Sequence, residues 1–367
     1  MISFIFVLYN NQIAMNIINR RNFLRTSLLG GLAVTYGSKA GAFVPSNSFD
    51  PNAAQVALTT GSNRADMVFR ALQPFSKQIS QAIGSKLVVL KPNNVSINIP
   101  LAATHADTLE GILEFLKSIN KLHNVVIAES AGGGSTLEGF SNYGYNRLAD
   151  KYPVKLVDLD QEKFELLYVF DEKDFSPHAM RVSSMLLSPD SYLVSVARMK
   201  THDRVLATLS LKNIVLGAPI KDLGFAWGPN RKPGAKNDKP IAHGGGYRGI
   251  NYNLYALAER LHPDLAIIDG FEGMEGNGPN SGTPVDHRVC LAGTDWLAAD
   301  RVGIELMGID FAKIGYLTYC AHAGMGVADL NRIEIIGERI ADHRKTYKLN
   351  DNLDRQLIWM TPPPPLS

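Results

Sequence analysis

Lys200, His202, Lys212 and Asn213 lie in one short stretch of the chain and combine groups that hold anions and transfer protons. Two ammonium groups and an imidazole around one pocket suit a carboxylate or phosphate, and a lysine beside another cation has a lowered pKa and can act as a base or nucleophile. His202 is the expected proton-transfer group, because the pKa of histidine lies near neutrality. Two solvated lysines and a surface histidine would give the same pattern, so both interpretations stand on these residues alone.

A second set of polar residues follows two short apolar runs that read as strands. Lys91 and Asn93 come directly after residues 87–90, and Glu129 and Ser130 directly after residues 125–128. Ligands of open α/β sheets collect at the carboxyl ends of the strands. We therefore expect these four side chains to converge on a ligand if the two strands are neighbours.

Two glycine-rich segments could bring backbone close to a ligand. Gly132–Ser135 resembles an anion-binding loop but has neither the Rossmann nor the Walker spacing, so a flexible turn before a helix is the preferred interpretation. Residues 270–284 hold many glycines, among them Gly276 and Gly278, and two prolines. This density predicts an irregular loop close to a ligand, with a merely mobile loop as the alternative.

Metal and redox chemistry have little support in the sequence. None of the nine histidines is spaced as a metal-binding pair, so a metal site would need distant segments that carry His202, His243, His287, His322 and Glu272. We leave the metal ligands unknown. Cys290 and Cys320 are too few for an iron–sulfur cluster, and they are either a disulfide or two small buried side chains.

The apolar pattern predicts an α/β fold that would position these groups. Short β-rich runs alternate with helical patterns, and a strand, a helix over residues 104–120 and a second strand form a βαβ unit, which implies a parallel sheet. We expect two Rossmann-like lobes with a cleft between them, and a helix over residues 206–211 that would bring Lys200 and Lys212 toward one face. The expected strands are residues 87–90, 125–128, 154–157, 192–196, 265–268, 288–291 and 333–336.

The N-terminus has the three parts of a twin-arginine export signal. Arg20 and Arg21 precede a moderately apolar stretch over residues 26–36, and Ala40-Gly41-Ala42 is a small-x-small cleavage site. We therefore expect a signal peptide over residues 1–42 and a periplasmic or extracellular protein that meets the twin-arginine translocase during export. The other expected parts are a linker and N-terminal helix over 43–84, an α/β domain over 85–346, possibly in two lobes, and a C-terminal tail over 347–367.

Charge and hydropathy exclude two classes of partner. The formal charge of the 367 residues is +2, and residues 1–42 carry four basic and no acidic residues, which leaves the rest at about −2. A near-neutral chain without a long basic run lacks the charge needed to neutralise several phosphates of a nucleic acid. No apolar stretch reaches the roughly 20 residues of a membrane-spanning helix, so we expect no membrane span in the mature chain.

The motifs together resemble the family catalogued as domain of unknown function 362. The resemblance rests on Lys91-Pro92-Asn93, Glu129 to Gly132, Lys200-Thr201-His202 with Lys212-Asn213, and Asp269-Gly270 with Gly276 to Pro279, followed by Thr294-Asp295. It implies an α/β fold and makes a functional role for these residues the preferred interpretation. Many members resemble iron–sulfur proteins through an appended segment with two cysteine clusters; this chain lacks that segment, so we expect no iron–sulfur cluster.

From these observations we expect an exported protein that binds a small anionic ligand or cofactor of unknown identity in an inter-lobe cleft. Oxidoreductase or isomerase chemistry ranks ahead of hydrolysis, because no hydrolase motif is present. The alternative is a non-catalytic periplasmic binding protein for a small anion or a metal complex. The expected catalytic residues are His202, Lys200 and Lys212. The expected ligand-binding residues are Lys91, Asn93, Glu129, Ser130, Asn213, Gly276 and Gly278.

Overall fold

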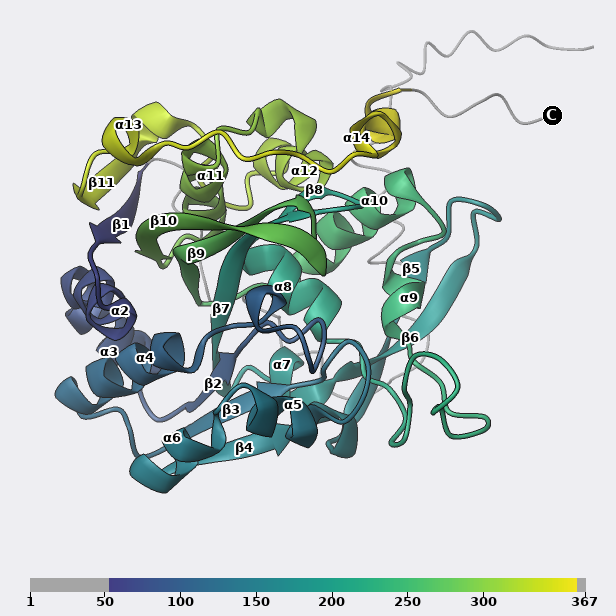
Figure 1. Ribbon diagram of the computed structural model, residues 1–367, viewed down its shortest axis with the longest axis horizontal. Coiled ribbons are helices and arrows are strands. Elements are labelled where there is room, and N and C mark those ends of the chain that lie inside the picture. The colour runs from purple at the N-terminus through teal and green to yellow at the C-terminus, as the bar shows by residue number, and fades with distance from the viewer. Residues whose placement is uncertain (1–52, 362–367) are drawn as a thin grey trace, which may run out of the picture. The chain divides into compact units, whose positions relative to one another are not determined.

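The computed structural model describes residues 53–361, which belong to one compact unit (Figure 1). Its main feature is a nine-stranded sheet, with a separate two-stranded sheet formed by β5 and β6. The strands are β1 (Ala54–Thr60), β2 (Leu87–Lys91), β3 (Val125–Glu129), β4 (Val154–Asp158), β5 (Phe164–Phe170), β6 (Pro177–Ser183), β7 (Ser191–His202), β8 (Leu206–Thr208), β9 (Leu265–Asn277), β10 (Ser281–Gly293) and β11 (Ile333–Gly337).

The order of the strands creates a ligand-binding position at the middle of the sheet. The path runs β11-β1-β10-β9-β7-β2-β3-β4, with β8 paired to β7. The pairs β2–β3, β3–β4, β2–β7 and β7–β9 are parallel. The chain builds outward from β2 through β3 to β4 and then returns to the other side of β2, so the order reverses between β2 and β7. Crevices at the carboxyl ends of strands at such a reversal are the usual ligand sites of open α/β sheets.

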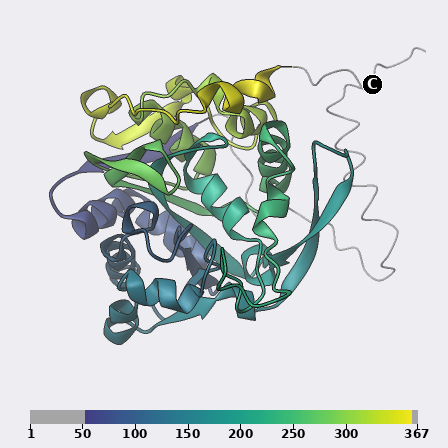
Figure 2. The same cartoon turned by 45° about the vertical axis from the view of Figure 1, so that its right-hand side comes forward.

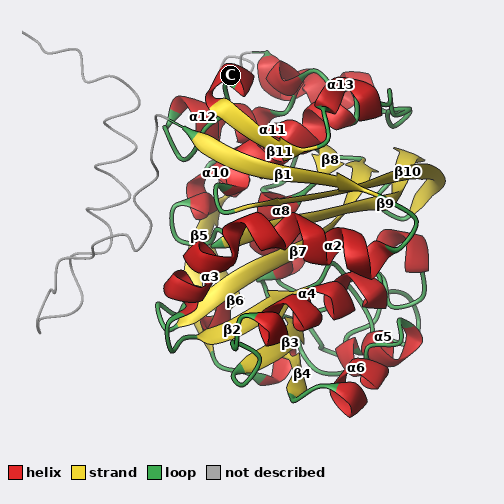
Figure 3. Ribbon diagram, turned by 90° about the vertical axis from the view of Figure 1, so that its left-hand side faces the viewer, coloured by secondary structure: helices red, strands yellow, loops and turns green. Residues whose placement is uncertain are grey.

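Helices cover both faces of the sheet, as the mixed α/β class requires (Figure 3). α2, α3 and α4 bury one face, and α8 with the helices from α10 to α12 buries the other. All twelve residues of β7 are buried, which explains why this strand reads as a continuous apolar run in its first half. The α-helices are α2 (Arg64–Leu72), α3 (Ser76–Ile83), α4 (Ala106–Ser118), α5 (Thr136–Asn142), α6 (Asn146–Lys151), α7 (Ser184–Leu187), α8 (Ser210–Gly217), α9 (Lys239–Ala242), α10 (Tyr247–Ala258), α11 (Trp296–Leu306), α12 (Gly315–His322), α13 (Ile340–His343) and α14 (Leu353–Gln356).

The expected α/β class is confirmed, whereas the expected pair of lobes is not seen in the described residues. The nine strands are continuous through hydrogen-bonded neighbours, and residues on both sides of β7 belong to the same compact unit. The helix expected after residue 64 is present in two parts, α2 and α3, with Pro74 in the short 3-10 turn between them. The signal peptide expected over residues 1–42 lies outside the described residues.

The expected linker contains a strand of the sheet. β1 lies between β10 and β11, and Val56, Ala57 and Leu58 are buried there. Its register with both neighbours places it in the sheet's interior, so the expected start of the ordered domain near residue 85 is too late. The Ser- and Asn-rich sequence before residue 54 conceals the change from linker to strand.

The glycine-rich segment expected to be an irregular loop forms the long hairpin of β9 and β10. The two strands pair from Asn277 and Ser281 at the tip to Ala266 and Gly293 at the base. A Cβ atom on Gly282 would lie 2.3 Å from the Glu275 carbonyl oxygen, so the glycine permits close approach of the strands. The segment can therefore form regular strands despite its many glycines, because a residue without a side chain lets the backbones of β9 and β10 approach closely.

Two further expectations are wrong. Residues 206–208 form β8 rather than the start of a helix, and α8 begins only at Ser210. The segment expected as a C-terminal tail packs on the domain as far as it is described: Tyr347 and Gln356 are buried, and Gln356 Oε1 accepts a hydrogen bond from the Leu206 amide at 2.7 Å. The proline run over residues 362–365 lies outside the described residues.

Figure 2 shows β5 and β6 as a two-stranded arm beside the main sheet.

Cys290 and Cys320 are both buried and unpaired, so the alternative of two small buried side chains is correct and the disulfide is absent. Within residues 53–361, no helix has the length and apolar character needed to cross a bilayer.

Candidate functional site

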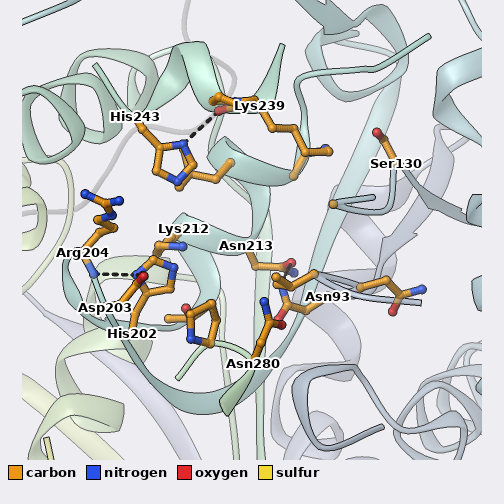
Figure 4. Close-up of a pocket in the computed structure, with 18 of the residues that line it drawn as sticks. Asn93, Ser130, His202, Asp203, Arg204, Lys212, Asn213, Lys239, His243 and Asn280 are labelled. Carbon is orange, nitrogen blue, oxygen red and sulfur yellow. Dashed lines mark hydrogen bonds and ion pairs between the residues drawn. The ribbon is translucent and has the colours of Figure 1, made fainter. Parts of the chain in front are cut away.

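A cavity of about 560 Å³ opens at the carboxyl ends of β2, β3 and β7 (Figure 4). This is the size of a pocket for a small molecule. Seven of the ten expected site residues line it, from four different segments of the chain. These seven are Lys91, Asn93, Glu129, Ser130, His202, Lys212 and Asn213.

The base of the cavity is built on a buried ion pair between β2 and β3. Lys91 Nζ lies 2.7 and 2.8 Å from the two carboxylate oxygens of Glu129. The same carboxylate accepts hydrogen bonds from the Asn94 amide at 3.0 Å and the Ser130 amide at 2.9 Å. Burial lowers the pKa of Lys91, and the negative charge of Glu129 opposes that effect. The ion pair thus holds the ends of β2 and β3 together, and the charges of Lys91 and Glu129 neutralise each other.

Asn213 connects α8 to this base. Its Oδ1 accepts hydrogen bonds from Asn93 Nδ2 at 3.0 Å and from Lys91 Nζ at 3.3 Å. Its Nδ2 donates to the Lys91 carbonyl oxygen and to Ser195 Oγ, both at 3.1 Å. Both sides of the amide are therefore engaged, so Asn213 positions the first turn of α8 rather than offering a free group to a ligand.

Lys212, the preceding residue on α8, differs from the other lysines of the site. Its side chain lines the cavity and makes no hydrogen bond or ion pair with any residue between 53 and 361. Burial lowers its pKa to about 7, against a smaller opposite effect of the Asp203 carboxylate. Near neutral pH, Lys212 is thus an ammonium and a neutral amine in comparable amounts, and an anion in the cavity would shift it to the ammonium form.

Two imidazoles lie near Lys212 and have opposite tautomers. The Arg204 amide donates to His202 Nδ1 at 3.0 Å, and Asp203 Oδ1 lies 3.2 Å from the same nitrogen. We assign the proton of neutral His202 to Nε2, because Nδ1 accepts from the amide. His243 Nδ1 lies 3.0 Å from the Lys239 carbonyl oxygen and must donate to it, which leaves the lone pair of Nε2 for the cavity. Burial, together with the charge of Lys212, lowers the pKa of His202 well below its usual value and that of His243 to about 4. Both rings are therefore neutral at pH 7. Figure 4 shows the hydrogen bonds that His202 and His243 make with the backbone of Arg204 and Lys239.

Two more cations and an aromatic ring complete the lining. Lys239 Nζ donates to the carbonyl oxygens of Gly217 at 2.9 Å and Pro219 at 2.6 Å, and burial lowers its pKa to about 7. The guanidinium of Arg204 lies 5.3 Å from the ring centre of Tyr247. At the rim, the indole of Trp227 is 64% exposed and its Nε1 donates to the Gly132 carbonyl oxygen at 3.2 Å. Four cationic side chains and two carboxylates, Glu129 and Asp203, therefore line the cavity.

Three expected site residues do not line the cavity. Lys200 is on β7 and Lys212 on α8, so they do not share a helix, and Lys200 Nζ donates to the Ala102 carbonyl oxygen at 2.7 Å. Gly276 and Gly278 lie at the tip of the β9–β10 hairpin, where a Cβ atom on Gly278 would be 2.2 Å from the Thr201 carbonyl oxygen. The hairpin tip thereby brings Pro279 and Asn280 to the cavity in place of the glycines.

The sequence analysis missed Arg204 and Lys239. Arg204 lies two residues beyond His202 at the end of β7, and this position was a usable signal. Lys239 follows a long irregular segment without apolar periodicity, so nothing in its sequence placed it near β2. Trp227, in the same segment, packs on Gly133, where a Cβ atom would lie 2.3 Å from its ring, so the glycine permits this contact.

The proposed metal candidates do not assemble. His202 and His243 share the cavity, but His287 is held by Tyr347 Oη at 2.9 Å and the His343 carbonyl oxygen at 2.6 Å. Glu272 lies 3.7 Å from Arg198 Nη1. Among the residues that the structure describes, no three histidine, cysteine or acidic side chains are arranged to hold a metal ion.

The comparisons with known proteins support the resemblance that the motifs carry. A protein named Thylakoid-associated protein sll1697, from Synechocystis sp., is 24% identical over 229 residues. The alignment covers 62% of this chain and 64% of that protein, so the chain spans less than two thirds of the relative's length. The family model described as Domain of unknown function (DUF362) matches residues 88–305, which include all ten expected site residues. Since this match covers more than half of the chain, the protein belongs to the DUF362 family.

Proposed function

We propose that the cavity binds a small carboxylate or phosphate ligand and that Lys212 is its principal contact. The observation that carries this proposal is the ammonium of Lys212, which is buried at the cavity wall without a partner among the described residues. A buried charge is costly unless it is paired, so an anionic ligand would supply the missing partner.

The surrounding charges support an anion rather than a cation. Glu129 is neutralised by Lys91, and Asp203 is the other carboxylate of the lining, whereas Lys212, Lys239 and Arg204 add positive charge. Walls of low dielectric strengthen the field of these groups inside the cavity. The two neutral imidazoles can donate to and accept from the same ligand, which suits a molecule with both a hydroxyl or carbonyl group and an anionic group.

Calorimetric titration with lactate and with glycerol 3-phosphate tests the anion site. Replacement of Lys212 by methionine keeps the length and apolar stem of the side chain and removes the charge, so affinity for both probes should fall by about tenfold or more. Lys155, an exposed lysine of β4, supplies the matched control: Lys155→Met should leave both affinities unchanged. Binding of neither probe to the wild type, or equal binding to wild type and Lys212→Met, would contradict the proposal.

We also propose that the chain is exported by the twin-arginine route. The support is the succession of Arg20-Arg21, an apolar stretch and a small-x-small site before the first strand of the sheet. Cell fractionation of the full chain should find it outside the cytoplasm, with residues 1–42 removed. Substitution of both arginines by lysine should hold the full-length chain in the cytoplasm, and unchanged export of this variant would contradict the route.

A further inference from the structure

We propose that Lys212 forms a Schiff base with an anionic aldehyde or ketone, such as a 2-oxo acid, bound in the cavity. The inference rests on the anion site proposed above and adds a covalent step to it. It assigns to Lys212 a reaction and to the ligand a carbonyl group next to its carboxylate or phosphate.

Four lysines lie in or beside the cavity: Lys91, Lys200, Lys212 and Lys239. Within the described part of the chain, only the side-chain nitrogen of Lys212 makes no hydrogen bond or ion pair. Lys91 Nζ is bound to Glu129 and to the Pro92 carbonyl oxygen at 2.8 Å, and Lys200 Nζ to the Ala102 carbonyl oxygen. Lys239 Nζ has two carbonyl acceptors. An amine that donates hydrogen bonds to carbonyl groups is held in place, whereas the nitrogen of Lys212 can turn its lone pair toward a ligand.

The state of the amine also fits attack on a carbonyl group. Burial lowers the pKa of Lys212 to about 7, so a large share of it is neutral at pH 7. An exposed lysine with an ordinary pKa near 10.4 is neutral in only about one molecule in a thousand at that pH. Lys212 therefore has a nucleophilic lone pair under conditions in which exposed lysines do not.

The two imidazoles supply the proton transfers that the step needs. Lys212 Nζ attacks the carbonyl carbon, and a C–N bond forms as the carbonyl π bond opens onto oxygen. His243 Nε2 accepts a proton from the nitrogen and returns it to the oxygen, while His202 Nε2–H donates a hydrogen bond to that oxygen. The nitrogen lone pair then forms the C=N bond as the C–O bond breaks, and His243 carries the second hydrogen of the nitrogen to the departing oxygen. Both hydrogens of the neutral amine thus leave with the oxygen as one water molecule, and no oxidant or reductant takes part.

Arg204 provides an anchor for the anionic group of the same ligand. Arg204 lies at the end of β7, two residues beyond His202, and its guanidinium can bind a carboxylate or phosphate through two parallel hydrogen bonds. The amine of Lys239, in contrast, is held by the carbonyl oxygens of Gly217 and Pro219. A ligand with its anionic group on Arg204 would present its carbonyl group to Lys212.

Reductive trapping of the full protein with cyanoborohydride at pH 7 tests the step. Pyruvate is the carboxylate probe and glyceraldehyde 3-phosphate the phosphate probe, and trapping adds the mass of one probe less one oxygen atom. Peptide mapping should place the adduct on Lys212, with a labelling rate on the order of a hundredfold above that of Lys155. The two probes distinguish a carboxylate from a phosphate as the preferred anion.

Lys212→Arg tests the covalent step. This variant keeps a positive charge but cannot form an imine, so it should lose the trapped adduct. Mapping of the wild type needs no variant and decides the matter even if Lys212→Arg does not fold. If lactate or glycerol 3-phosphate binds but Lys212 is labelled no faster than Lys155, the Schiff base is wrong and the anion site stands. If neither of these two analogues binds the wild type, the proposed function itself is wrong.

Discussion

At the scale of single residues, the site is a group of buried lysines whose charges the protein satisfies in different ways. Lys91 has a carboxylate partner, and Lys200 and Lys239 have backbone carbonyl acceptors. Lys212 has none among the described residues. Since an unpaired ammonium in a protein interior costs free energy, Lys212 lowers the stability of the fold, and a bound anion would restore part of it.

The cost of burying Lys212 predicts a particular pH dependence of stability. The pKa of a lysine is near 10.4 in an unfolded chain, whereas that of folded Lys212 is about 7. Between these values the unfolded chain binds more protons, so the contribution of this group to the free energy of unfolding rises with pH. Below pH 7 both states are protonated and the full cost is present.

Lys212→Met removes this contribution and should therefore be more stable than the wild type at pH 7. Its advantage should shrink by roughly 2 kcal/mol between pH 7 and pH 9, measured by urea unfolding at each pH without added anions. Lys155→Met, which removes an exposed ammonium, should show no such trend. If the free energy of unfolding of Lys212→Met exceeds that of the wild type by an amount that stays constant or grows toward pH 9, Lys212 is not a buried, unpaired amine.

The chemistry-bearing residues could be predicted from the sequence where a polar group directly follows an apolar run. Lys91 and Glu129 were found in this way, because the carboxyl ends of neighbouring parallel strands meet at one edge. The different roles of Lys200 and Lys212 could not be predicted from the sequence. They depend on the fact that Lys200 lies on β7 and Lys212 on α8, and on the direction of each side chain. Lys239 could not be predicted at all, because it reaches the cavity from a segment without periodicity.

At the scale of elements, the β9–β10 hairpin shapes one wall of the cavity. Thr201 Oγ1 on β7 donates to the Gly276 carbonyl oxygen at 2.9 Å, and Gly278 packs directly against the Thr201 backbone. Pro279 and Asn280 follow at the tip and line the cavity. The two glycines expected to bind a ligand thus hold the hairpin against β7, and they do so in different ways.

Gly278→Ala and Gly276→Asn should separate these two roles. A Cβ atom on Gly278 would meet the Thr201 carbonyl oxygen at 2.2 Å, so Gly278→Ala should lower the free energy of unfolding by about 1–3 kcal/mol and weaken ligand binding by displacing Asn280. Gly276 has φ +76° and open space around its Cβ position, and asparagine tolerates that φ. Gly276→Asn should therefore cost less than Gly278→Ala in urea unfolding; equal or reversed losses would contradict the packing role of Gly278.

The elements of this wall were also the hardest to predict from sequence. Glycine density was read as a sign of irregular structure, but here it reflects close approach of β9, β10 and β7, which no local pattern reveals. β8 was missed for a similar reason: its three residues are a strand only because they pair with β7. The runs of β2 and β3 were predictable because burial of parallel strands makes them almost continuously apolar. The edge strands β4 and β11 each contain an exposed charged residue but are otherwise mainly apolar.

At the scale of the whole molecule, the sheet order converts distant sequence segments into one positively charged cavity. The reversal of strand order between β2 and β7 leaves a crevice there, and α8, α9 and the hairpin tip close it with Lys212, Lys239 and Asn280. Because these charged side chains come from separate segments, they produce a positive electrostatic potential in the cavity only when the chain is folded. The ionisation of Lys212 reports on that field and on any anion that enters it.

The most direct measurement is the pKa of Lys212 with and without an anion, followed by NMR of the ¹³C-labelled lysines and assigned with Lys212→Arg. Without ligand the resonance should titrate near pH 7, and saturating glycerol 3-phosphate or lactate should raise that pKa by about one unit or more, since a bound anion favours the ammonium form. A titration of Lys212 that neither probe moves would contradict an anion site centred on this residue.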